Sequence, residues 1–72
     1  MYRRPVKSSD IKSVGYDPLR GILELEFVTG KVFRYGAVSH EVFEELDQAE
    51  SKGKYFWRNI RNTYPFEEGE EV

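Results

Sequence analysis

The residues of this chain that point most directly to chemistry lie in SKGKYFWRNIRNTYP, residues 51–65. This stretch holds four basic and four aromatic residues and no acidic residue. Basic side chains neutralise phosphates and aromatic rings stack on bases, so the mixture is typical of surfaces that bind single-stranded nucleic acid. It is also compatible with an ordinary last helix that closes a small core.

On a helix, Phe56, Ile60 and Tyr64 recur every four residues and form one apolar stripe. Trp57 then lies on the other side, among the basic residues. Two interpretations of Trp57 remain open: its ring is an exposed stacking platform, or it lies flat with arginines stacked on it as cation–π pairs. The candidate nucleic-acid contacts are Lys52, Lys54, Trp57, Arg58 and Arg61, with Lys31 and Arg34 as rim contacts.

Catalytic and metal-binding chemistry has little support in the sequence. His40 is the only histidine, and there is no cysteine. The absence of cysteine excludes disulfides, zinc–thiolate sites and cysteine nucleophiles. No glycine motif has the spacing of a phosphate-binding loop. We therefore expect a protein that is not an enzyme and that has no cofactor and no metal site.

Three strands followed by two helices are expected to position these residues. Apolar–polar alternation and β-branched residues mark the strands, and Ser39 and Ser51 are good N-caps for the helices. These segments are the strands 10–16, 22–27 and 31–35 and the helices 40–50 and about 53–62. The expected fold is α+β: a three-stranded antiparallel β-meander covered on one face by two short C-terminal helices.

A three-residue loop closed by Gly30 gives the best register between the second and third strands. In that register Phe33 and Tyr35 lie opposite leucines and face the core. They would otherwise be able to stack bases, as aromatics do on RNA-binding sheets. Glu24 then lies opposite Arg34 on the outer, solvated face, a favourable pair of about 0.2–1 kcal/mol.

The charges are unevenly distributed along a chain that is long enough for one domain. Residues 39–50 carry five acidic residues and no Lys or Arg, and residues 67–72 carry four glutamates that would compete for the basic surface. We expect a flexible basic arm (1–8), a folded domain (9–66) and a disordered acidic tail (67–72). Without a signal peptide or a membrane-spanning apolar run, the expected location is the cytoplasm.

The segments SSDIKSVGYDP, LELEF, GKVFRY and SKGKYFWRNIRNTYP together resemble the KTSC domain. This short module is named for its occurrence at the C-terminal end of some lysyl-tRNA synthetases, and it also occurs as a free-standing bacterial protein. Where the family has Tyr-x-Tyr, this chain has Phe33-Arg34-Tyr35, so a packing role carries over but a role for both hydroxyls does not. The resemblance implies one compact module, and its synthetase context implies RNA binding.

The expected function is therefore that of a small, non-catalytic module that binds RNA weakly, with a tRNA-like partner. The alternative is a protein-interaction module in which the acidic and basic helices engage a protein partner and Trp57 is the anchor. The RNA expectation requires that Lys54, Arg58 and Arg61 share one side of the helix and that no neighbouring carboxylate occupies them.

Overall fold

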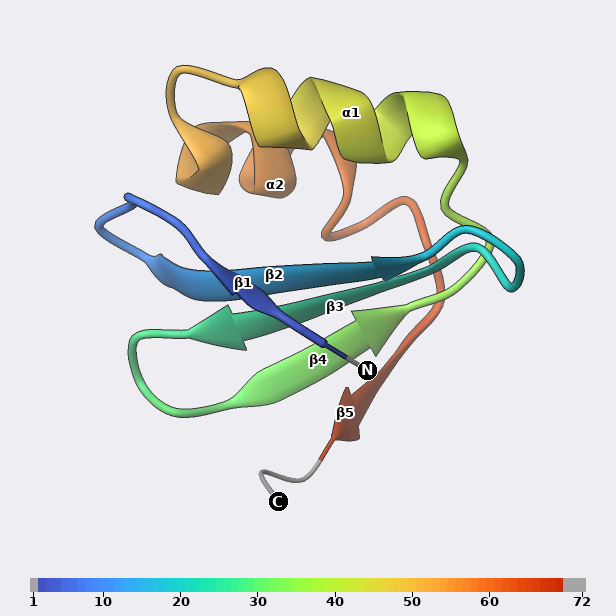
Figure 1. Cartoon of the computed structure of the whole chain (residues 1–72), viewed down its shortest axis with the longest axis horizontal. Coiled ribbons are helices and arrows are strands. Elements are labelled where there is room, and N and C mark those ends of the chain that lie inside the picture. The colour runs from blue at the N-terminus through green and yellow to red at the C-terminus, as the bar shows by residue number, and fades with distance from the viewer. Residues whose placement is uncertain (1, 70–72) are drawn as a thin grey trace.

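Two helices cover one face of a five-stranded antiparallel sheet (Figure 1). This computed structural model describes residues 2–69. The strands lie in the sheet in chain order, and both helices come between β4 and β5. The elements are β1 (Arg4–Pro5), β2 (Ile11–Asp17), β3 (Ile22–Phe27), β4 (Val32–Tyr35), α1 (His40–Gln48), α2 (Lys52–Asn59) and β5 (Phe66–Gly69).

The α+β class is confirmed, but the prediction of three strands is wrong. The expected flexible arm, 1–8, contains β1, which pairs with β2. The expected disordered tail, 67–72, contributes residues 67–69 to β5, which pairs with β4. Residues 70–72 lie outside the described residues. Because β5 follows them, the two helices are not strictly C-terminal.

The turn between β3 and β4 has the predicted three-residue form. Gly30 has a φ of 93°, in the left-handed region that favours glycine. Glu24 lies opposite Arg34, and the β3 leucines lie opposite Phe33 and Tyr35, as predicted. Both aromatic residues of β4 therefore face the helices and pack against the core.

The two predicted N-caps are confirmed. The Ser39 hydroxyl accepts a hydrogen bond from the Val42 N–H at 3.2 Å, and the Ser51 hydroxyl accepts one from the Lys54 N–H at 3.3 Å. Each helix ends two or three residues before the predicted position. The core lies between the helices and the sheet, and its fully buried side chains include Ile11, Leu23, Leu25, Val38, Leu46 and Ile60.

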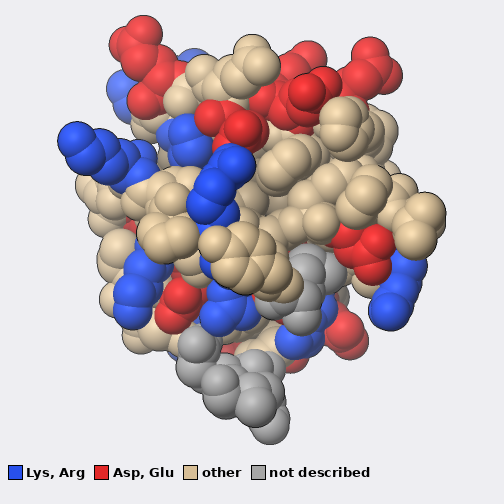
Figure 2. Space-filling model, in the orientation of Figure 1, with Lys and Arg blue, Asp and Glu red and all other residues tan. Residues whose placement is uncertain are grey.

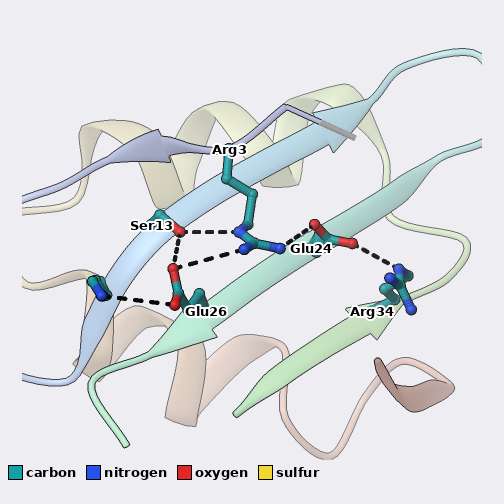
Figure 3. Close-up of polar contacts among 6 residues, drawn as sticks. Arg3, Ser13, Glu24, Glu26 and Arg34 are labelled. Carbon is teal, nitrogen blue, oxygen red and sulfur yellow. Dashed lines mark hydrogen bonds and ion pairs between the residues drawn. The ribbon is translucent and has the colours of Figure 1, made fainter. Parts of the chain in front are cut away.

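The outer face of the sheet is not the solvated face that the alternation predicts. Arg3 crosses β2 and donates to the Glu24 carboxylate at 2.6 Å, and Arg34 donates to the other carboxylate oxygen at 2.6 Å (Figure 3). The Ser13 hydroxyl accepts from Arg3 at 3.1 Å and donates to Glu26 at 2.9 Å. Glu24 is only 2% exposed. The N-terminal arm is thus held on the sheet by charge-assisted hydrogen bonds.

Candidate functional site

Helix α2 is divided into a buried side and an exposed side. Phe56 and Ile60 are 3% and 0% exposed, and they belong to the core. Lys54, Trp57 and Arg58 are exposed. The predicted apolar stripe is therefore confirmed at Phe56 and Ile60, whereas Tyr64 lies beyond the end of α2 and is half-buried.

Trp57 has a feature of each interpretation: its ring is exposed, and one arginine is stacked on it. The residue is 53% exposed, and the Arg61 guanidinium lies 4.1 Å from the centre of its ring. Arg61 is not on the helix as predicted, because α2 ends at Asn59. Its N–H donates to the Phe56 carbonyl at 3.0 Å, which keeps the turn after α2 close to the helix. Trp57 is therefore an exposed ring with a cation–π partner.

Four predicted contacts share one surface, which we call the basic–aromatic face: Lys54, Trp57, Arg58 and Arg61. Trp57 and Arg58 lie three and four residues after Lys54 on α2, so these three share one side of the helix, and the cation–π contact with Trp57 places Arg61 beside them. The other predicted contacts lie elsewhere or have partners of their own. Lys52 is half-buried and donates to the Asp47 carbonyl at the end of α1, at 2.9 Å.

Arg34 and Lys31 do not extend the basic–aromatic face. Arg34 pairs with Glu24 on the sheet face opposite the helices, so it is not the rim contact that was predicted. Lys31 is exposed in the turn between β3 and β4, and no ion pair of Lys31 occurs within residues 2–69. Of the seven predicted contacts, the structure brings together the four that define the face.

The cations of the basic–aromatic face are available to an anion. Within the described part of the chain, no carboxylate pairs with Lys54, Arg58 or Arg61. Many acidic side chains lie along the top of the molecule in Figure 2, where Figure 1 shows α1, and others lie at the right and lower on the same face. The requirement that no neighbouring carboxylate occupies these three cations is therefore met within residues 2–69.

A groove of ≈ 360 Å³ adjoins the basic–aromatic face, and the sequence did not predict it. Strands β3 to β5 form it together with α2 and the turn that follows. Phe66 of β5 completes its wall, with its ring 5.7 Å from that of Phe33. Sequence reasoning missed the groove because β5 was not predicted. Its aromatic lining residues are Phe27, Phe33, Tyr35, Phe56, Trp57 and Phe66.

Tyr35 supplies a polar group to this groove from a side chain that is almost completely buried. The residue is 3% exposed, and its hydroxyl makes no hydrogen bond to any residue from 2 to 69. The oxygen is nevertheless not sealed from solvent. Burial raises the pKa of Tyr35 above its ordinary value, although the positive charge of Arg61 partly opposes this. The hydroxyl is therefore a neutral hydrogen-bond donor and acceptor at physiological pH.

The residues that could carry other chemistry do not converge. His40 is exposed at the start of α1, with Nδ1 3.5 Å from the Glu44 carboxylate. Residues 2–69 contain no cluster of three or more His, Cys, Asp or Glu side chains that could hold a metal ion. Over the same residues, neither helix has the length and apolar character needed to cross a membrane.

Comparisons with known proteins agree with the architecture. A KTSC domain matches residues 7–64. The crystal structure of a KTSC domain protein from Yersinia pestis has a TM-score of 0.91 and 33% identity, over 96% of this chain and 97% of that chain. An uncharacterized protein of Stutzerimonas stutzeri is 46% identical over 56 residues, which are 78% of this chain and 79% of the relative.

A longer enzyme contains a related segment. A lysine–tRNA ligase of Nostoc sp. is 40% identical over 62 residues, or 86% of this chain but only 11% of the ligase. The match is therefore to one small part of that enzyme. The domain match, the shared architecture and the small relatives of similar length agree with one another: the chain belongs to the KTSC domain family.

Proposed function

We propose that this protein is a small, non-catalytic module that binds RNA through its basic–aromatic face. The observation that carries the proposal is the arrangement of Lys54, Arg58 and Arg61 around a half-exposed indole, without carboxylate partners in the described part of the chain. The related segment in lysine–tRNA ligases supports RNA as the polymer, since those enzymes are named for tRNA.

The energetics favour weak, salt-dependent binding. Three phosphate contacts give a slope of log K against log salt of about −2 for a single strand. Stacking of one base on an aromatic ring adds about 1–3 kcal/mol. The net charge of −2 opposes any long-range attraction, so affinity has to come from the local surface.

The direct test is a titration of labelled single-stranded RNA, followed by fluorescence anisotropy at two salt concentrations. Arg58→Glu should weaken binding about tenfold or more, because it replaces a phosphate contact with a repulsive charge. Lys7→Glu makes the same charge change at an exposed position outside the face and should have little effect. Equal losses in the two variants, salt-independent affinity, or no binding at micromolar protein would overturn the proposal.

Neighbouring residues of α2 separate binding from folding. Phe56 is buried against the rings of Phe27 and Tyr35, so Phe56→Ala should lower the free energy of unfolding by about 3–5 kcal/mol. Trp57→Ala should retain the fold and lose RNA affinity. Urea denaturation and the anisotropy titration measure the two effects. Unfolding of Trp57→Ala would place the indole in the core and contradict the binding face.

Material that co-purifies with the protein distinguishes the proposal from the protein-interaction alternative. Nucleic acid absorbing at 260 nm supports RNA binding. A stoichiometric protein partner, with no nucleic acid, would instead favour an interaction surface that uses Trp57 as its buried anchor.

A further inference from the structure

The groove and the basic–aromatic face are parts of one continuous surface. Trp57 and Arg61 belong to both. A polynucleotide whose phosphates lie on Lys54, Arg58 and Arg61 therefore has the groove immediately beside its backbone. The cations next to the aromatic wall complement a phosphate next to a base.

The shape and lining of the groove suit one planar aromatic ring. Its volume of ≈ 360 Å³ lies at the lower end of the ~300–1,000 Å³ range of small-molecule sites. Phe33 and Phe66 meet edge to face, at an interplanar angle of 81°. Their rings and the indole of Trp57 offer apolar surface on which a base packs, because every base has a π-face.

The polar groups of the groove suit the edge of a nucleobase. The Tyr35 hydroxyl lies on a side chain that is almost completely buried, yet it has no hydrogen-bond partner within residues 2–69. The Asn62 side chain also lines the groove, and no hydrogen bond engages it within the same residues. Both polar groups reach solvent, and the donors and acceptors on a base edge can replace the water that they meet there.

From these observations, and resting on the function proposed above, we infer that the groove receives one unpaired nucleobase and that the bound RNA is single-stranded there. A base in a duplex is stacked and paired, so it cannot enter the groove without being flipped out. A duplex can still place phosphates on Lys54, Arg58 and Arg61. The groove thus makes the protein selective for unpaired RNA.

Trp57 provides a built-in reporter because it is the only tryptophan of the chain and it lines the groove. The experiment compares a short single-stranded RNA with the same strand annealed to its complement, at one salt concentration. The single strand should quench Trp57 fluorescence and bind about tenfold more tightly than the duplex. The duplex should bind weakly, through phosphates, and leave the fluorescence unchanged.

Tyr35→Phe tests the polar contact while keeping the ring that packs in the core. It should weaken binding of the single strand about two- to tenfold and leave duplex binding unchanged. Tyr64→Phe is the matched control, because this half-buried tyrosine follows α2 but does not line the groove.

The outcomes separate the inference from the proposed function. Equal affinity for single-stranded and duplex RNA with no quenching overturns the base-binding groove and leaves the basic–aromatic face as the RNA contact. Equal effects of Tyr35→Phe and Tyr64→Phe also overturn the groove. If neither RNA binds, both the base-binding groove and the RNA-binding face are overturned. Both are also overturned if an aromatic peptide quenches Trp57 fluorescence and RNA does not.

Discussion

One tyrosine joins the two helices and gives the fold a pH dependence. The Tyr55 hydroxyl of α2 donates to the Glu45 carboxylate of α1 at 2.6 Å. Burial, the hydrogen bond to Glu45 and the negative charge of Glu45 together raise the pKa of Tyr55 to about 12. In the unfolded chain a tyrosine has a pKa of about 10, so the folded state holds the proton more strongly. The hydrogen bond therefore stabilises the fold below about pH 10, and its contribution is lost as pH rises toward 12.

At the scale of this residue, we predict that Tyr55→Phe makes the free energy of unfolding fall less steeply as the pH rises in the alkaline range. Between about pH 10 and about pH 12 the native protein should lose unfolding free energy more steeply than the variant, as measured by urea denaturation at each pH. Tyr16 and Tyr35 also have raised pKa values, so some slope should remain. Tyr2→Phe, at an 82% exposed position, should keep the native slope. Parallel slopes for Tyr55→Phe and the native protein would show that the bond to Glu45 does not couple to folding.

At the scale of elements, regular side-chain patterns made the central strands and the helices predictable. The Leu–Glu alternation of β3 set its register with β4, and Ser39 and Ser51 marked the helix starts. The two edge strands carry no such pattern. β1 has two residues, one of them a proline, and β5 reads FEEG, which resembles a solvated tail.

Contacts with residues far away in the chain determine both edge strands. Arg3 fixes the arm through Glu24, and the Phe66 ring lies 5.5 Å from that of Tyr35. The basic–aromatic face could be predicted because its residues on α2 follow helical spacing. The groove could not be predicted, because its wall includes Phe66 of β5. Periodic spacing in the sequence predicts single strands and helices, whereas the groove depends on contacts between elements that are far apart in the chain.

The prediction at this scale concerns Gly69, at the end of β5. A Cβ atom there would collide with the guanidinium of Arg34, which Glu24 holds in place. Gly69→Val should displace either the guanidinium or the end of β5, and so weaken the bonding of the buried Glu24 carboxylate. We expect the free energy of unfolding to fall by about 1–3 kcal/mol in urea denaturation. Glu68→Val, at an exposed position of the same strand, is the control; equal stabilities in the two variants would contradict the steric argument.

At the scale of the whole molecule, the sheet separates the acids of β5 between its two faces. Glu68 lies opposite Phe33 and therefore on the groove side, whereas Glu67 lies opposite Arg34 on the other side. The expected competition between the acidic tail and RNA should therefore come from Glu68 and not from Glu67. Truncation after Phe66 would remove the pairing of β5 as well as its charge, so it does not isolate the electrostatic effect. Replacing a single glutamate with glutamine removes one charge and keeps the strand, so it isolates the electrostatic effect.

We therefore predict that Glu68→Gln strengthens RNA binding and that Glu67→Gln does not, although both change the net charge by one unit. Removing one like charge beside the groove should raise affinity about two- to fivefold at low salt. The gain should shrink at high salt, because exposed charges are screened beyond about 10 Å at 0.1 M ionic strength. Anisotropy titrations at both salt concentrations measure it. Equal gains in the two variants would mean that net charge, not position, controls affinity. No gain in either would mean that β5 does not screen the groove.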